Sequence, residues 1–194
     1  MIRLIAAIAL LCALAACAPT TGPSPGSRAD VAALTRALQA MSPGVDPAEA
    51  AHAADLSYRY TFQLAQQYQI TDAPLVHNAK VNAGKKPRGL CYHWATDMQH
   101  LLNQSGFETL EIQRAIANAA NPILIEHSSA VITARGAPMH SGVIIDPWRQ
   151  GGRLFWSPVT QDRRYDWKER GAELRRLGRV TYVNPDGTAS LQPE

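Results

Sequence analysis

The sequence predicts an α+β domain in which helices come first and a mainly antiparallel sheet follows. Up to about residue 104 apolar residues recur at helical spacings of three and four, whereas from residue 107 they occur in short runs rich in β-branched residues. Helices and strands that are segregated along the chain are typical of α+β architecture. The 194 residues are 46% hydrophobic with a net charge of only +3, which fits a globular protein and does not favour nucleic acid as a partner.

Residues 1–16 have the pattern of a bacterial export signal. A positive charge precedes an uninterrupted apolar run that is shorter than the about 20 residues of a transmembrane helix. The signal ends in Leu14-Ala15-Ala16-Cys17, which resembles the lipobox of bacterial lipoproteins. That resemblance implies cleavage before Cys17, acylation of Cys17 and anchoring in a lipid bilayer of the cell envelope, with Ala18 indicating the periplasmic face of the outer membrane. The alternative is an ordinary secretory signal.

Residues 17–27 are rich in Pro, Gly, Ser and Thr, and we expect a flexible linker there. Residues 28–194 are expected to form a single domain, since no internal repeat or second linker is found in them. After export only Cys17 and Cys91 remain of the three cysteines, so we expect no disulfide framework. Cys91 is then a free thiol in an exported protein.

Two helices are expected at the start of the domain. The first spans Ser27 to Met41, where apolar residues recur at helical spacing. The second begins at Asp46, an N-cap residue followed by Pro47 at the first helical position, and extends to about Gln69. Its candidate buried stripe has a residue at every fourth position and consists of Leu56, Tyr60, Leu64 and Tyr68.

A third helix is expected from Cys91 to about Gln104, where Ser105-Gly106 ends it. Its pattern of small and apolar residues places Cys91 on the buried face of the first turn. Residues 74–90 contain Gly, Pro, Asn and Lys, and we expect them to form a loop that leads into Cys91. A loop of this length within a compact domain is usually functional or packed over a site.

Five strands are expected in the second half of the domain, because the apolar pattern there is extended. They are Phe107–Ala117, Ile123–Thr133, Val143–Ile145, Leu154–Trp156 and Val180–Val183. Between the last two, residues 162–179 contain seven Lys and Arg residues interleaved with acidic ones. This segment fits a solvated helix or loop, and a patch for an anionic ligand is the alternative.

His127 and Asp146, on neighbouring expected strands, are predicted to face each other. The turn Arg135-Gly136-Ala137-Pro138 separates the two strands. A hairpin centred within that turn pairs residue 131 with 142 and residue 127 with 146, which brings the Cβ atoms of His127 and Asp146 to about 5 Å. A carboxylate beside an imidazole is what a catalytic base needs in order to hold its tautomer and favour the imidazolium.

Cys91 is the candidate nucleophile for this pair. A free thiol with a pKa of about 8.5 is only a few per cent thiolate at pH 7, but a helix N-terminus and a neighbouring imidazolium lower the pKa of such a thiol. The Cys91 backbone N–H is a candidate oxyanion donor, and a second donor is expected from residues 78–88. The alternative of a zinc site is disfavoured because Cys91 and His93 lack same-face helical spacing and no second cysteine pair exists. We expect no metal and no cofactor.

Three segments of the chain resemble the bacterial transglutaminase-like superfamily. They are Gly89-Leu90-Cys91-Tyr92-His93-Trp94-Ala95, His127-Ser128-Ser129-Ala130-Val131-Ile132 and Val143-Ile144-Ile145-Asp146-Pro147-Trp148. Members of that superfamily share a papain-like core with Cys, His and Asp in this order, at gaps close to the 36 and 19 residues found here. The resemblance covers about residues 75–160. It implies Cys91 as nucleophile, His127 as base and Asp146 as orienting carboxylate, and it departs at Ser129, where the family often has an aromatic residue.

The superfamily contains transglutaminases, peptidases, deamidases and inactive relatives. We therefore expect a membrane-anchored thiol enzyme that acts on amide bonds of peptide or cell-envelope substrates, by hydrolysis or by acyl transfer. Trp94, Trp148 and Trp156 are candidates for lining its cleft, although two of the three fit the core better. The alternative function is that of a catalytically inactive envelope lipoprotein that uses the same fold as a binding module.

Overall fold

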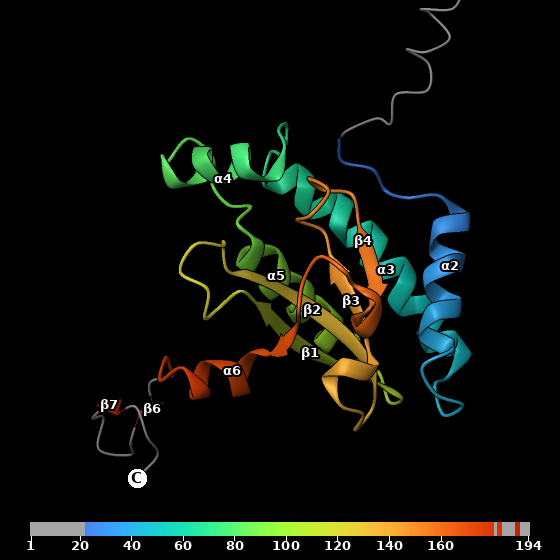
Figure 1. The fold of residues 1–194 in the computed structure, drawn as a ribbon. Helices are drawn as coiled ribbons and strands as arrows, with labels where there is room; N and C mark the ends of the chain where they lie inside the picture. Colours follow the sequence, from blue (N-terminus) through green and yellow to red (C-terminus); the bar gives the residue numbers. More distant parts are fainter. Residues whose placement is uncertain (1–21, 181, 184–188, 191–194) are drawn as a thin grey trace, which may run out of the picture.

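A computed structural model describes residues 22–180, together with the backbone of residues 182–183 and 189–190 (Figure 1). The signal peptide, Cys17 and the first part of the linker lie outside the described residues. None of the helices within the described ranges is long and apolar enough to cross a bilayer. The helices are α2 (Arg28–Gln39), α3 (Pro47–Gln67), α4 (Pro74–Asn82), α5 (Cys91–Gln104) and α6 (Arg170–Arg176).

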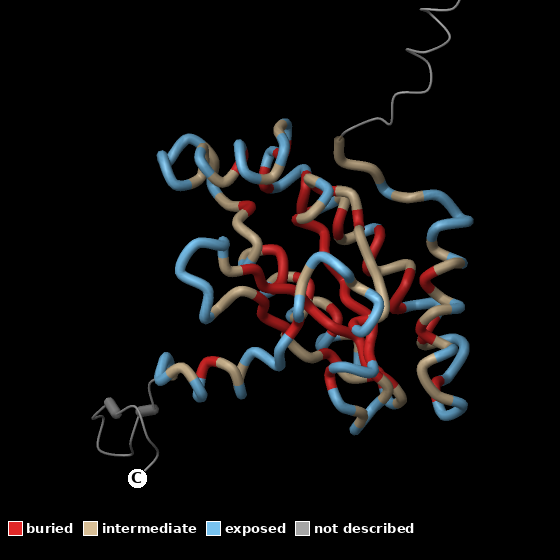
Figure 2. Tube along the Cα trace, in the orientation of Figure 1, coloured by how far each residue is buried: buried red, intermediate tan, exposed pale blue. Residues whose placement is uncertain are grey.

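Five strands form one antiparallel sheet in the order β4-β3-β2-β1-β5. They are β1 (Leu110–Ala117), β2 (His127–Ala134), β3 (Val143–Asp146), β4 (Phe155–Pro158) and β5 (Lys168–Glu169). Helix α5 packs on one face of the sheet, α3 packs on α5, and α2 packs on α3. The buried chain is concentrated where α5 and the inner side of α3 meet the sheet (Figure 2). The predicted order of N-terminal helices followed by a mainly antiparallel sheet, with the Cys91 helix packed on it, is therefore confirmed.

The predicted N-cap of the second helix at Asp46 is confirmed, and the first helix also begins with a side-chain cap. Ser27 and Asp30 exchange hydrogen bonds at the start of α2 in a capping box. Asp46 Oδ1 accepts from the N–H groups of Ala48 and Glu49 at the start of α3. The predicted stripe of α3 is correct only in part, since Leu64 and Tyr68 are buried and the other two members are half-buried. Besides Tyr58, the other buried residues of α3 are small; they are Ala50, Ala53, Ala54, Ser57, Thr61 and Ala65.

The predicted loop over residues 74–90 is wrong in its first half, which forms α4. Pro74 occupies the first turn of this helix, where a proline costs nothing because its missing N–H has no helical partner. The N-cap residue is Ala73, whose side chain makes no capping bond, so the usual start signal is absent. Buried His77 connects α4 to the segment that precedes Cys91, because its Nε2 lies 2.8 Å from the carbonyl oxygen of Arg88. Gly89 has φ +124, and a Cβ there would lie 2.4 Å from that same ring nitrogen.

The observed register of β2 on β3 is two residues away from the predicted one. Val131 pairs with Ile144, whereas the prediction pairs residue 131 with 142. The connection contains a 3-10 helix, Met139–Ser141, so pairing starts only at Val143. Because side chains alternate along a strand, a shift of two residues keeps every side chain on its predicted face, whereas a shift of one would have reversed them all.

Two other strand predictions need correction. Strand β2 begins at His127, not at residue 123, and the segment before it is an exposed loop. The fifth strand of the main sheet is Lys168–Glu169, which pairs with β1. Of the predicted strand at 180–183, Tyr182–Val183 forms β6, which pairs with β7 (Ala189–Ser190) in a separate two-stranded sheet.

Candidate functional site

His127 and Asp146 form a buried hydrogen-bonded pair. His127 Nε2 lies 2.7 Å from Asp146 Oδ2, and the two side chains are 2% and 1% exposed. His127 begins β2 and Asp146 ends β3, and both share the sheet face that carries Val131 and Ile144, opposite α5. In the observed register they are diagonal neighbours rather than directly opposed, and two side chains of this length span the diagonal separation of about 7–8 Å.

A buried arginine, Arg149, also binds Asp146. Arg149 Nε donates to Asp146 Oδ2 at 3.0 Å, and the Arg149 backbone N–H donates to Oδ1 at 3.1 Å. The two terminal nitrogens of Arg149 donate to the two oxygens of Asp162 at 3.1 and 2.6 Å. The guanidinium carbon lies 3.8 Å from the ring centroid of Phe155. The imidazole, the two carboxylates and the guanidinium therefore form one connected network, which has no net charge when His127 is protonated.

Three aromatic rings surround His127. The ring centroids of Trp148 and Tyr165 each lie 4.7 Å from that of His127, and the centroid of Trp167 lies at 5.3 Å. Trp167 also donates from Nε1 to Asp162 at 2.8 Å, so it is fixed by the same ionic network. These rings help to bury the imidazole, which is 2% exposed, and so exclude water from it.

The surroundings of His127 favour the imidazolium. Burial by itself lowers the pKa of His127, but the Asp146 carboxylate, by charge and hydrogen bond, and the Cys91 thiol raise it to about 9. Burial would raise the pKa of Asp146, but the charges and hydrogen bonds of His127 and Arg149 keep it below its usual value. Asp146 is therefore ionised and His127 is protonated at neutral pH.

This raised pKa predicts a pH-dependent stability. The protonated form of His127 is favoured in the folded state, so its contribution is complete below the unfolded pKa of 6.5 and is lost as the pH rises through about 9. This difference between the folded and unfolded pKa of His127 corresponds to a decrease of about 3 kcal/mol in the free energy of unfolding as the pH rises. Urea unfolding at pH 6 and pH 9.5 should show this decrease in the wild type and not in His127→Gln. Equal pH dependence in the two proteins would contradict the assignment.

Cys91 begins α5 and is half-buried. Its Sγ lies 3.7 Å from the carbonyl oxygen of Glu126, the residue that precedes His127. Nε2 of His127 is engaged by Asp146, and within the described structure Nδ1 is a buried nitrogen with no hydrogen-bond partner. The Cys91 thiol is close enough to this imidazole to be among the groups that raise the pKa of His127. The structure thus brings all three predicted site residues of the domain into one region.

The N-terminal turn of α5 is capped from within the helix. Leu90 occupies the N-cap position and has no polar side chain. His93 Nδ1 instead accepts from the backbone N–H groups of Gly89 and Leu90 at 3.2 and 3.3 Å. The N–H group of Cys91 lies in the first helical turn, where no carbonyl of the helix can pair with it.

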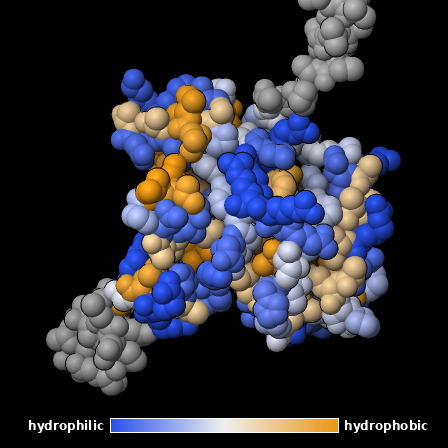
Figure 3. All heavy atoms as spheres, viewed as in Figure 1, coloured by the Kyte–Doolittle hydropathy of each residue, from blue (hydrophilic) through white to orange (hydrophobic). Residues whose placement is uncertain are grey.

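An apolar surface flanks the thiol. The loop that ends at Glu126 exposes Ile123, Leu124 and Ile125, of which Ile123 is 89% exposed, and Tyr92, the residue after Cys91, is also exposed. Hydrophobic atoms gather over α4 and where this loop meets the start of α5 (Figure 3). The loop is ordered by Asn121 Oδ1, which accepts from the N–H groups of Ile123 and Leu124 at 2.9 and 2.8 Å.

Several residues of the site were missed by the sequence analysis. Arg149 and Asp162 lack any motif. The composition of residues 162–179 predicts a solvated segment, whereas Asp162, Tyr165 and Trp167 lie at the site. Of the three predicted tryptophans, Trp148 contacts His127, whereas Trp94 and Trp156 pack in the core, as expected for two of the three. The signal that points to Arg149 is its position three residues after Asp146, which allows a local ion pair.

Helix α4 contributes to the site through Asn78. Asn78 Oδ1 accepts from Trp148 Nε1 at 3.1 Å, and the Trp148 ring contacts His127. Asn78 lies within residues 78–88, where a second oxyanion donor is predicted. Because Trp148 donates only, the oxygen of the Asn78 amide is fixed towards it and the amide nitrogen points elsewhere.

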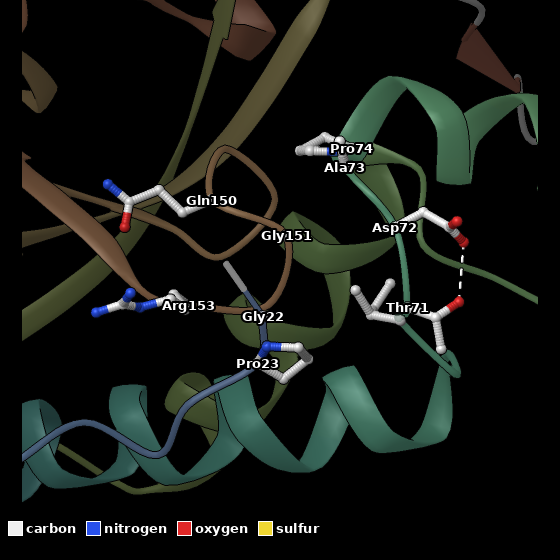
Figure 4. Close-up of a pocket in the computed structure, with 10 residues that line it drawn as sticks. Gly22, Pro23, Thr71, Asp72, Ala73, Pro74, Gln150, Gly151 and Arg153 are labelled. Atoms are coloured by element: carbon white, nitrogen blue, oxygen red, sulfur yellow. Dashed lines mark hydrogen bonds between the residues drawn. The ribbon is translucent and has the colours of Figure 1, made fainter. Parts of the chain in front are cut away.

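A cavity of about 630 Å³ lies beside the loop that follows Arg149 (Figure 4). It is enclosed by the N-terminal segment at Gly22 and Pro23, by the α3–α4 connection and by the loop at Gln150 and Gly151. Its acidic residue, Asp72, accepts from Thr71 at 2.9 Å and from Lys80 at 2.8 Å. None of the predicted site residues lines it.

The part of the chain that the structure describes contains no group of three or more His, Cys, Asp or Glu residues arranged to hold a metal ion. No family model, no curated protein and no solved structure matches the chain.

Proposed function

We propose that the protein is a lipid-anchored thiol enzyme of the cell envelope that acts on amide bonds, as a transglutaminase-like protein with a papain-like core. The observation that carries this proposal is the buried His127–Asp146 pair beside the free thiol of Cys91. Structural cysteines do not need a cationic imidazole beside them, whereas a thiolate nucleophile does. Anchoring through Cys17 and a location on the periplasmic face of the outer membrane belong to the same proposal.

In the proposed reaction the Cys91 thiolate attacks the carbonyl carbon of the amide. A tetrahedral oxyanion forms and accepts a hydrogen bond from the backbone N–H of Cys91. The C–N bond then breaks, His127 gives its Nδ1 proton to the leaving amine, and a thioester remains on Cys91. Water or a second amine, deprotonated by His127, attacks the thioester and regenerates the thiol. Asp146 keeps Nε2 engaged throughout, so that Nδ1 is the nitrogen that exchanges the proton.

The thioester gives the direct test. Full-length protein is incubated with a cell-envelope extract, quenched in acid and digested, and the Cys91 peptide is analysed by mass spectrometry before and after hydroxylamine. We expect a hydroxylamine-sensitive acyl adduct on Cys91 in the wild type, at least tenfold less in His127→Ala, and none in Cys91→Ala. The absence of an adduct from a thiol that still alkylates rapidly would contradict the enzyme and favour the inactive binding module.

A further inference from the structure

Arg114 connects the two elements that carry the thiol and the imidazole. Its Nη1 donates to Thr96 Oγ1 on α5 at 3.1 Å, and its Nη2 donates to Ser128 Oγ on β2 at 2.9 Å. Helix α5 begins at Cys91, and Ser128 follows His127 directly. The guanidinium therefore lies between the first turns of the Cys91 helix and the start of the His127 strand, on the sheet face that α5 covers.

The charge of Arg114 has no carboxylate partner among the described residues. Its third contact, Gln99 Oε1 at 3.4 Å, is neutral like the other two, and its Nε–H is buried without an acceptor in the described structure. Burial and the nearby charge of Arg170 lower the pKa of Arg114 to about 10, and Cys91 is the group that acts in the opposite direction. Arg114 thus remains a cation at neutral pH, and no carboxylate of the described residues pairs with it.

A cavity of about 550 Å³ lies beside this guanidinium, at the edge of β1 between α5 and α6. Arg114 and Arg170 both line it. Its two acidic residues bond to backbone at its wall and do not pair with either arginine: Glu111 accepts from the N–H of Gly136 at 3.0 Å, and Glu169 caps the first turn of α6 and lies 4.0 Å from Arg175. The two arginines are therefore the groups in this cavity that an anion can neutralise.

We infer that the protein selects amide substrates that carry a carboxylate near the scissile bond, and that Arg114 is the residue that recognises this carboxylate, with Arg170 adding positive charge at the rim. Because α5 rises 1.5 Å per residue, Thr96 and the guanidinium that it contacts lie about 8 Å along the helix from Cys91. An extended peptide covers this distance in about two residues. This inference rests on the proposed function, in which Cys91 is the nucleophile.

Two bromoacetyl reagents of equal length test the inference. Bromoacetyl-glycine carries a carboxylate at the inferred reach, and bromoacetyl-glycinamide is its uncharged counterpart. In both, Cys91 Sγ displaces bromide and forms a thioether, so the ratio of the two alkylation rates reports recognition of the carboxylate. We expect Arg114→Gln to lower the charged-to-neutral ratio about tenfold or more, because a charge-assisted hydrogen bond is lost. The exposed Arg170→Gln should lower it about two- to threefold.

Arg59→Gln is the matched control, since it removes one positive charge from α3, where Arg59 pairs with Asp55 on the surface. Its ratio should equal that of the wild type. An unchanged ratio in both Arg114→Gln and Arg170→Gln, or an equal loss of rate with both reagents, would overturn the inference and leave Arg114 as a brace between α5 and the sheet. Alkylation requires only the thiol and no catalytic turnover. The charged-to-neutral ratio can therefore stay unchanged in the variants while the acyl adduct on Cys91 is still found. The two proposals can thus be tested separately.

Discussion

Replacing His127 with alanine is expected to slow the alkylation of Cys91 by iodoacetamide about 100-fold at pH 6. A thiol with a pKa of about 8.5 is only about 0.3% ionised at that pH. In the wild type, His127 is an imidazolium at pH 6, because its pKa is raised to about 9, and under the proposed function it stabilises the thiolate. Rates measured from pH 5 to pH 10 should therefore be nearly constant over the acidic range in the wild type and should follow an ordinary thiol titration in His127→Ala.

His100→Ala is the control for this measurement. His100 lies on the exposed side of the same helix, α5, and contacts Gln104. It should leave the rate profile unchanged. Similar profiles in the wild type and His127→Ala would mean that the imidazole does not act on the thiol, and the thiol enzyme would then be excluded.

Replacing Arg149 with methionine is expected to lower the free energy of unfolding by about 3–5 kcal/mol at pH 7. The change leaves the carboxylates of Asp146 and Asp162 buried without the guanidinium that both of them contact. Methionine retains an apolar side chain that can pack on Phe155, so the loss reports charge more than packing. Urea unfolding followed by tryptophan fluorescence measures it.

Two further variants test whether the loss of stability comes from the unpaired carboxylates. Arg59→Met breaks an exposed pair with Asp55 and should cost less than about 1 kcal/mol. Adding Asp162→Asn to Arg149→Met should recover part of the lost stability, because it removes one of the two unpaired charges. A cost below about 1 kcal/mol for Arg149→Met, or a larger cost for the double variant, would contradict a structural role for the network.

The helices show how far local sequence signals extend. Helix α5 has the predicted bounds, because a polar, glycine-rich stretch precedes Cys91 and Ser105-Gly106 follows Gln104. Helix α4 was missed because Ala73 cannot supply a capping side chain and because the glycines and lysines after Asn82 dominate the composition. Capping chemistry is local and can be read from the sequence; a helix without it depends on tertiary contacts such as the one between His77 and Arg88.

At the start of β2 the sequence predicts strand where the structure has a loop. Ile123 and Ile125 have strong β propensity, yet they lie in an exposed loop. Strand β1 ends at Ala117, which pairs with His127, and Asn118 then adopts a left-handed φ of 62° that turns the chain away. Residues before His127 therefore have no neighbouring strand to pair with. β propensity does not contain the position of a partner strand, and a segment forms a strand only where a partner strand can hydrogen-bond to it.

The sequence alone placed Cys91 at the start of a helix and put His127 and Asp146 on the same face of a sheet. Both results follow from short-range periodicity, which survives a register error of two residues. Only the tertiary structure decided the register itself, because the 3-10 helix at Met139–Ser141 shortens the hairpin. The tertiary structure alone also shows that Asp162 contacts Arg149, and that Arg114 has no carboxylate partner among the described residues. Contacts of this kind join residues that no local pattern relates, and their energies depend on burial, which arises only when the chain is folded.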